Sequence, residues 1–168
     1  MNHPKIRIVV KDFGTMTAEL YPEFAPRTVA NFIGLAKKNF FEGLIFHRVI
    51  SGFMLQGGGY TADMTERETA SIPGEFAANG YRNNTLRHTR GVLSMARTMD
   101  PNSASSQFFV MHKAAPHLDG QYAAFGKVIE GDSIIDDIAN VETGNYGYYM
   151  QDVPLTAVVI EKIEVIEE

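Results

Sequence analysis

Arg48 has the clearest potential for chemistry in this sequence, because it is a charged side chain placed among apolar ones. It belongs to the segment 46–59, FHRVISGFMLQGGG, which is typical of two short strands joined by a glycine turn. Alternate residues of a strand share a face, so Arg48 points to the same side as Ile50, and Met54 to the same side as Gln56. A guanidinium beside thioether and amide groups suits a neutral, partly apolar ligand. The segment therefore predicts one wall of a binding pocket.

The remaining residues that could carry chemistry fit structural roles better. His47 and His88 are typical of hydrogen-bonded core histidines, and His112 and His117 have no companion cluster of metal ligands. Glycines 57–59 lack the Lys-Ser/Thr continuation of a phosphate-binding loop. The sequence also lacks the Gly-x-Ser-x-Gly motif of serine hydrolases. We therefore predict neither a metal site nor a cofactor.

The composition is that of a globular protein that works away from nucleic acid and membranes. A length of 168 residues predicts one domain, 1–168, with a substantial buried core. The 15 basic and 20 acidic side chains give a net charge of −5, which argues against nucleic-acid or membrane-surface partners. Cysteine is absent, and so are a signal-like apolar segment and any run near 18 apolar residues. We therefore expect a cytoplasmic protein and a monomer.

Short segments of alternating hydrophobicity predict a mainly β fold. Strand patterns occupy 6–10, 15–20, 91–96, 107–111, 125–129 and 157–166, in addition to the pair around Arg48. A helix is predicted from Pro26 to Lys38, and a shorter one follows Asp132, which we expect to cap it. The polar stretch 61–84 predicts a long surface excursion, and 141–153 predicts an ordered loop. Many antiparallel strands favour a closed sheet, because closure removes exposed edges.

Three separated parts of the sequence share the pattern of one family. They are 46–58, which reads Phe-His-Arg-x-Ile-x-Gly-Phe-Met-x-Gln-Gly-Gly; 94–96 with 106–109, SMA and SQFF; and 118–120 with 125–128, LDG and FGKV. Together with similar flanking sequence, nearly the whole chain resembles the cyclophilins, and it looks most like their cytoplasmic bacterial branch. The resemblance implies a closed eight-stranded antiparallel β-barrel capped by two α-helices.

The resemblance also implies a function, that of a peptidyl-prolyl cis-trans isomerase that assists folding by accelerating X-Pro bond rotation. Arg48 would be the catalytic group, donating a hydrogen bond to the twisted amide nitrogen without a covalent intermediate. The implied substrate-binding residues are Phe53, Met54, Phe109 and Leu118 in the apolar pocket for proline, Gln56 and Gln107 as hydrogen-bonding groups, Ala96 and Arg97 through their backbone, and His117 and Tyr122 on the rim.

Four positions depart from the family pattern. Arg97 stands where asparagine is frequent, Ser51 where proline is frequent, and Tyr122 where many members have histidine. His117 stands where many members have tryptophan, whose indole helps to recognise cyclosporin, so tight binding of cyclosporin-type ligands is in question. The expected partners are proline-containing peptides and unfolded protein chains.

Two alternatives remain open at this point. An arginine in a strand is most often half-exposed and paired with a carboxylate, and phenylalanine and leucine most often belong to the core. A proline-peptide binding or chaperone-like module with little turnover would use the same groove. A guanidinium of Arg48 beside an apolar hollow would favour catalysis, whereas a guanidinium paired with a carboxylate would favour the first alternative.

Overall fold

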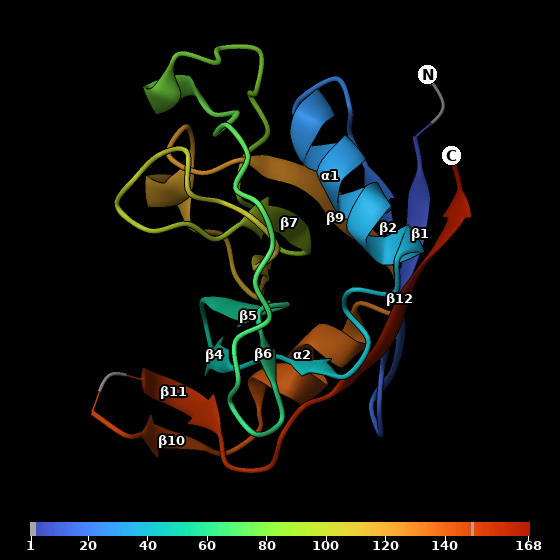
Figure 1. Cartoon of the computed structure of the whole chain (residues 1–168), viewed down its shortest axis with the longest axis vertical. Coiled ribbons are helices and arrows are strands. Elements are labelled where there is room, and N and C mark those ends of the chain that lie inside the picture. Colours follow the sequence, from blue (N-terminus) through green and yellow to red (C-terminus); the bar gives the residue numbers. More distant parts are fainter. Residues whose placement is uncertain (1–2, 149) are drawn as a thin grey trace.

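An eight-stranded antiparallel sheet forms the body of the protein (Figure 1). The structure is a computed structural model that describes residues 3–148 and 150–168. In sheet order, the strands are β12 (Ile160–Glu167), β1 (Lys5–Val10), β2 (Gly14–Leu20), β9 (Ala124–Glu130), β7 (Val92–Met95), β8 (Phe108–Met111), β5 (Met54–Gly57) and β4 (Arg48–Ile50). All neighbouring strands are antiparallel. The predicted mainly β fold is confirmed.

The sheet forms a half-barrel, so its closure is less complete than the sequence analysis predicted. Strands β12 and β4 lie at the two ends of the hydrogen-bonded order. The chain just before β4 spans part of the gap, because the N–H of Gly43 donates to the Ile160 carbonyl (2.9 Å) and that of Phe46 to the Val158 carbonyl (3.0 Å). These bonds satisfy part of the open edge, which would otherwise invite pairing with another chain.

The two predicted helices are present at different ends of the sheet (Figure 1). Helix α1 (Pro26–Lys37) lies beside β12, whereas α2 (Ser133–Ala139) lies against β2, β4 and β5. Pro26 is placed in the first turn, where a missing backbone N–H costs nothing. None of the helices in the described part of the chain is long and apolar enough to cross a membrane.

Helix α1 is capped by a side chain from a distant part of the chain. Ala25 precedes it and offers no side-chain acceptor for the free N–H groups of the first turn. Glu75, which is 4% exposed, accepts hydrogen bonds from the N–H of Arg27 (3.2 Å) and from the N–H and hydroxyl of Thr28 (both 2.7 Å). A carboxylate at this end also complements the helix dipole. Glu75 thereby fastens the long excursion to α1.

The long polar excursion predicted over 61–84 is confirmed in its main character. It contains the end of the short strand β6 (Tyr60–Thr61), which pairs with β3 (Leu44–Ile45), and one turn of 3-10 helix, η1 (Ala77–Asn79). The rest of the excursion has no regular helix or strand beyond isolated bridges. Its shape therefore depends on side-chain anchors such as Glu75.

Two local predictions were wrong. The expected loop over 141–153 is a hairpin of β10 (Thr143–Tyr146) and β11 (Met150–Pro154), in which glycines and tyrosines obscure the alternation. Asp132 stands at the start of α2, but its side chain makes no capping hydrogen bond. Its carboxylate lies 3.5 Å from the Arg90 guanidinium instead.

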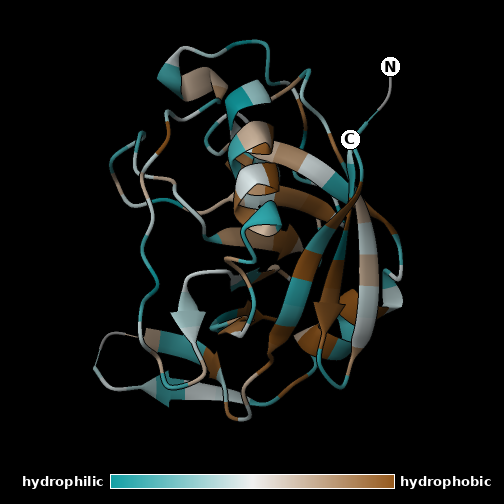
Figure 2. Ribbon diagram, turned by 45° about the vertical axis from the view of Figure 1, so that its right-hand side comes forward, coloured by the Kyte–Doolittle hydropathy of each residue, from teal (hydrophilic) through white to brown (hydrophobic). Residues whose placement is uncertain are grey.

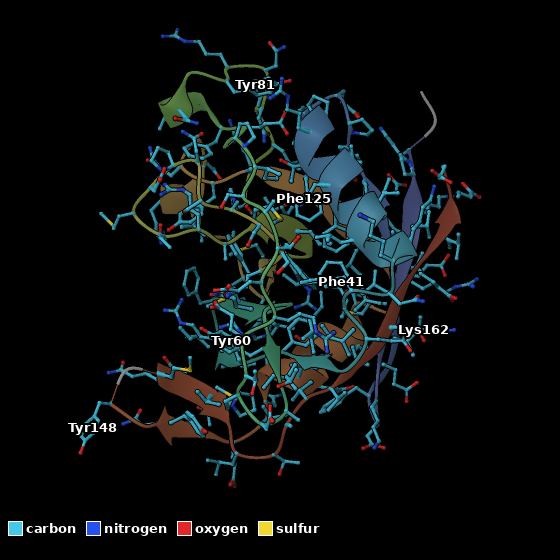
Figure 3. The ribbon with its side chains drawn as sticks, in the orientation of Figure 1. Phe41, Tyr60, Tyr81, Phe125, Tyr148 and Lys162 are labelled. Carbon is cyan, nitrogen blue, oxygen red and sulfur yellow. The ribbon has the colours of Figure 1, made fainter. Side chains whose placement is uncertain are left out.

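Strand alternation divides the apolar side chains into two clusters. The larger one contains Leu55 and Val110 together with most of the phenylalanines, and in Figure 3 the labelled Phe125 lies in the interior whereas Tyr148 points outward. A smaller cluster lies on the opposite face of the same strands and consists of Met54, Val92, Phe109, Met111, Ala115, Leu118 and Ala124. Bands of hydrophobic and hydrophilic residues along the strands are visible in Figure 2. The smaller cluster is where the candidate site forms.

Candidate active site

Arg48 lies at the edge of the smaller cluster, on β4. The strand register pairs it with Gln56 and pairs Ile50 with Met54, which agrees with the predicted faces of the two strands. Its Nη1 donates to Gln56 Oε1 (3.4 Å), and Gln56 Nε2 donates to Gln107 Oε1 (3.0 Å). The salt bridges found within the described residues all use other cationic side chains. Arg48 is therefore held by the neutral amide of Gln56 and remains exposed to a ligand.

A pocket of about 140 Å³ opens beside the Arg48 guanidinium. Its size is below the roughly 300–1,000 Å³ of sites that enclose a drug-sized ligand, so it suits one ring-sized group. Nine of the residues predicted for the site line it, namely Arg48, Phe53, Met54, Gln56, Ala96, Arg97, Phe109, Leu118 and Tyr122. The structure thus brings together residues from widely separated parts of the sequence.

The floor of the pocket is apolar and well buried. Met54 on β5, Phe109 on β8 and Leu118 in the 3-10 turn η2 (Pro116–Leu118) are 2%, 5% and 8% exposed. The Tyr122 ring meets Phe109 edge to face, with centroids 5.7 Å apart. The His88 ring stacks on Phe109 at 6.0 Å. An apolar floor lowers the local dielectric, which strengthens a hydrogen bond from Arg48 to a ligand.

The two other predicted residues, Gln107 and His117, lie next to the pocket rather than in its lining. Gln107 accepts the hydrogen bond from Gln56 and lines an adjacent hollow that also includes Glu66. The His117 ring stacks on Phe53 with centroids 5.9 Å apart and an interplanar angle of 29°. Both are therefore placed to support a lining residue.

The side chain of Arg97 has a role that the sequence analysis missed. Its guanidinium lies 4.6 Å from the centre of the Tyr122 ring and 4.8 Å from that of Phe76. Its Nη2 and Nε donate to the Gln121 carbonyl, at 2.7 and 3.2 Å. Arg97 thereby fixes one rim of the pocket through cation–π contacts, a role that asparagine at this position could not fill.

Comparison with known proteins agrees with this geometry. The family described as "Cyclophilin type peptidyl-prolyl cis-trans isomerase/CLD" matches residues 5–165. The chain belongs to the cyclophilin family. A peptidyl-prolyl cis-trans isomerase of Acinetobacter baylyi is 44% identical over 159 residues, which cover 92% of this cyclophilin and 81% of the relative. Peptidyl-prolyl cis-trans isomerase B of Escherichia coli is 38% identical over 162 residues, covering 92% and 95%.

Solved structures support the same assignment. A crystal structure of a cyclophilin type peptidyl-prolyl cis-trans isomerase from Cryptosporidium parvum superposes with a TM-score of 0.80 at 26% identity, covering 99% of each chain. The same Cryptosporidium protein, solved in the presence of the dipeptide Ala-Pro, gives a TM-score of 0.78 at 27% identity, covering 98% of this chain and 99% of that one. This cyclophilin is a peptidyl-prolyl cis-trans isomerase.

Beneath the pocket, this cyclophilin contains a serine, a histidine and an aspartate that are hydrogen-bonded to one another as in a hydrolase triad. His88 Nε2 lies 2.8 Å from the Ser94 hydroxyl, and Asp119 Oδ1 lies 3.1 Å from His88 Nδ1. Ser94 and His88 are 0% and 1% exposed, so no substrate carbonyl can reach the hydroxyl. Burial lowers the pKa of His88, although Asp119 acts in the opposite direction. We therefore assign the three residues to the support of Phe109, on which His88 stacks.

His47, the neighbour of Arg48, is a buried histidine without a satisfied ring. It is 7% exposed, and its Nδ1 has no hydrogen-bond partner among the described residues. Burial, and secondarily the charge of Arg48, lower the pKa of His47 from 6.5 to about 4. The ring is therefore neutral at physiological pH and cannot act as a general acid there.

The lowered pKa of His47 predicts a loss of stability in acid. In the unfolded chain His47 binds a proton near pH 6.5, whereas in the folded chain it does so only near pH 4. The free energy of unfolding therefore falls as the pH decreases between these values. Between pH 6.5 and 5 the contribution is about 2 kcal/mol. Urea unfolding of the wild type and of His47→Phe at pH 7 and pH 5 measures it. Equal losses in both proteins would contradict the assignment.

Proposed function

We propose that this cyclophilin binds the proline of an X-Pro segment in the pocket, and that Arg48 donates a hydrogen bond to the amide nitrogen as the bond twists. The observation that carries this proposal is the guanidinium of Arg48 at the rim of an apolar pocket, held by Gln56 and not by a carboxylate. Its substrates are proline-containing peptides and unfolded or flexible protein segments, and its action assists folding.

The chemistry follows from the electronic structure of the amide. Rotation about a peptide bond has a barrier of roughly 18–20 kcal/mol, because the nitrogen shares its lone pair with the carbonyl. In the twisted state the nitrogen regains that lone pair, so a donor aimed at it binds the transition state better than the planar ground state. Lowering the barrier by about 7 kcal/mol accelerates exchange about 10⁵-fold. No bond to the protein forms.

The residues around Arg48 have separate tasks in this proposal. Met54, Phe109 and Leu118 receive the proline ring and exclude water, and Phe53 closes the pocket from the side of the β4–β5 turn. Gln56 orients the guanidinium and is in turn oriented by Gln107. The backbone at Ala96 and Arg97 holds the residue before proline in an extended pose, with Tyr122 and His117 on the rim.

We expect catalysis to be nearly independent of pH. An arginine keeps its charge at any physiological pH, and the mechanism uses no general acid or base. The rate of cis/trans exchange of an Ala-Pro peptide, measured by exchange spectroscopy, should be flat between about pH 6 and 9. A bell-shaped profile in this range would argue for a titrating catalytic group.

A proline-peptide binding or chaperone-like module with little turnover is the second candidate. The same pocket supports it, because proline binding alone needs only the apolar floor and a hydrogen-bonding rim. Exchange spectroscopy separates the two functions, since a binding module changes the peptide resonances without accelerating exchange. The isomerase relatives favour the first candidate.

We expect cyclosporin-type ligands to bind this protein weakly. The imidazole of His117 offers less apolar surface than an indole and lies stacked on Phe53. Replacing His117 by tryptophan should therefore lower the Kd for cyclosporin about tenfold or more, which corresponds to about 1.4 kcal/mol. Titration calorimetry on wild type and H117W checks this expectation. An unchanged Kd would place the weakness elsewhere in the pocket.

We further propose that the protein acts in the cytoplasm as a monomer, with one domain formed by residues 1–168. The absence of cysteine, and therefore of disulfides, is compatible with a reducing compartment. The large apolar side chains found exposed are few, namely Met99, Ile129, Tyr146, Tyr148 and Leu155. Sedimentation of the purified protein measures the oligomeric state.

A further inference from the structure

His112 fastens the turn that presents Phe53 to the pocket. The N–H of Gly52 donates to His112 Nδ1 (2.8 Å), and the backbone N–H of His112 donates to the Phe53 carbonyl (2.9 Å). The N–H of Lys113 adds a longer bond to the same carbonyl (3.4 Å). His112 is 8% exposed and does not itself line the pocket. Side chain and backbone of one residue thus hold the turn from behind.

The His112 ring is held in one orientation and one tautomer. Because its Nδ1 accepts the Gly52 hydrogen bond, the ring proton belongs on Nε2, which faces Asp136 Oδ1 at 3.0 Å. Asp136 on α2 also accepts two hydrogen bonds from Arg90, at 2.9 and 3.0 Å. Arg90 in turn donates to the His112 carbonyl (3.3 Å) and to the Asp132 carbonyl (3.1 Å). A continuous network therefore runs from α2 to the turn.

The turn itself needs this external support. Gly52 has a φ of +82°, a left-handed conformation, and the turn closes with a single bond from the Phe53 N–H to the Ile50 carbonyl (3.0 Å). Ser51 and Gly52 are exposed. A short exposed turn at the end of an edge strand has few contacts of its own to fix the direction of its side chains. The bonds to His112 supply that constraint.

We propose that His112 is a positioning residue for the isomerase reaction. By holding the Gly52 N–H and the Phe53 carbonyl, it sets the Phe53 ring against the proline pocket beside Arg48, and Asp136 keeps the His112 ring in the accepting tautomer. The inference rests on the pocket proposed above. The network of His112, Asp136 and Arg90 thus contributes to substrate binding, although none of these three side chains touches the substrate.

Two variants at residue 112 separate positioning from packing. His112→Leu fills the site but offers no hydrogen-bond acceptor. It should raise KM for an Ala-Pro peptide about tenfold with little change in kcat, because the lost contact binds the ground state and the transition state equally. His112→Asn places an amide oxygen near the position of Nδ1, so it should recover most of that loss. A purely structural histidine predicts lower stability in both variants with KM unchanged.

A double-mutant cycle tests the role of Asp136. Asp136→Ala should raise KM about threefold in the wild type and have no further effect in His112→Leu, because residues in one hydrogen-bond network are not additive. Asp136 is half-exposed on α2 and outside the pocket lining, so we expect Asp136→Ala to fold, and urea unfolding checks this. The amide proton of Gly52, followed by NMR, should move upfield when its acceptor is removed.

A matched control is His3, another histidine that is bound to a carboxylate, with its Nε2 2.7 Å from Glu23 Oε2. His3→Leu should leave KM unchanged. A wild-type KM in His112→Leu, together with a shifted Gly52 amide, would overturn the proposal while the isomerase mechanism stands. If His112→Leu fails to fold, the KM values of His112→Asn and Asp136→Ala are compared instead. A raised KM in Asp136→Ala beside a nearly normal KM in His112→Asn supports the proposal, and equal KM values contradict it. Retained activity in Arg48→Ala points to a different failure, that of the proposed catalytic group.

Discussion

Arg48→Ala is expected to fold normally and to isomerise an Ala-Pro peptide about 10²–10³-fold more slowly than the wild type, the usual cost of removing one donor from a developing lone pair. Folding should be unaffected, because the Arg48 side chain is exposed and its only hydrogen bond in the described residues is the 3.4 Å bond to Gln56. Exchange spectroscopy measures the rate directly. In the wild type we expect exchange broadening of the peptide resonances, and in the variant we expect its loss.

Two further variants sharpen this test. Arg48→Lys keeps a positive charge but not the planar set of donors, so it should remain well below the wild-type rate if directed hydrogen bonding matters more than charge. Arg7→Ala is the matched control, because Arg7 is also a strand arginine and lies 3.6 Å from Glu164 at a distant edge of the sheet. Near wild-type exchange in Arg48→Ala would sink the mechanism. Equal losses in Arg48→Ala and Arg7→Ala would indicate a general effect of charge.

Glu75→Ala should lower the free energy of unfolding by roughly 1–3 kcal/mol, the cost of leaving buried hydrogen-bond donors without their acceptor. The substitution leaves two backbone N–H groups of α1 and the Thr28 hydroxyl without their acceptor. It also frees the excursion that Glu75 fastens. Urea unfolding at pH 7, followed by circular dichroism, gives the difference.

The chain provides graded comparisons for Glu75. Glu75→Gln keeps one oxygen acceptor and the side-chain volume, so its loss should be smaller than that of Glu75→Ala. Glu164→Ala removes a carboxylate that is paired at the surface with Arg7, and we expect it to change stability by less than about 1 kcal/mol. A Glu75→Ala protein as stable as the wild type would show that α1 finds another cap.

Features set by local pattern could be predicted from the sequence. Alternation placed Arg48 on one face with Ile50 and Met54 on one face with Gln56, and the register, which pairs Arg48 with Gln56 and Ile50 with Met54, agrees with it. Pro26 with the apolar spacing that follows it predicted α1 closely. The hairpin over 143–154 escaped because its glycines and tyrosines carry little alternation. Local patterns therefore predict elements well only where side-chain burial follows the period of a strand or of a helix.

Interactions between distant residues could not be predicted in the same way. Glu75 caps a helix that begins 49 residues earlier, and no local motif marks the pair. Arg97 was expected to act through its backbone, yet its side chain lies over Tyr122. His112 was set aside for lack of metal-ligand partners, although its partner is the N–H of Gly52. A backbone donor has no signature in a sequence.

The pairing of β1 with β12 has a consequence for how the polypeptide matures. Strand β1 bonds on one side to β2, its neighbour in sequence, and on the other to β12, which a ribosome makes more than 140 residues later. Until then one edge of β1 has no hydrogen-bonding partner and can associate with other nascent chains. Native assembly of this isomerase therefore waits for the release of residues 160–167 from the exit tunnel. A catalyst of slow folding steps thus itself depends on a late, long-range step.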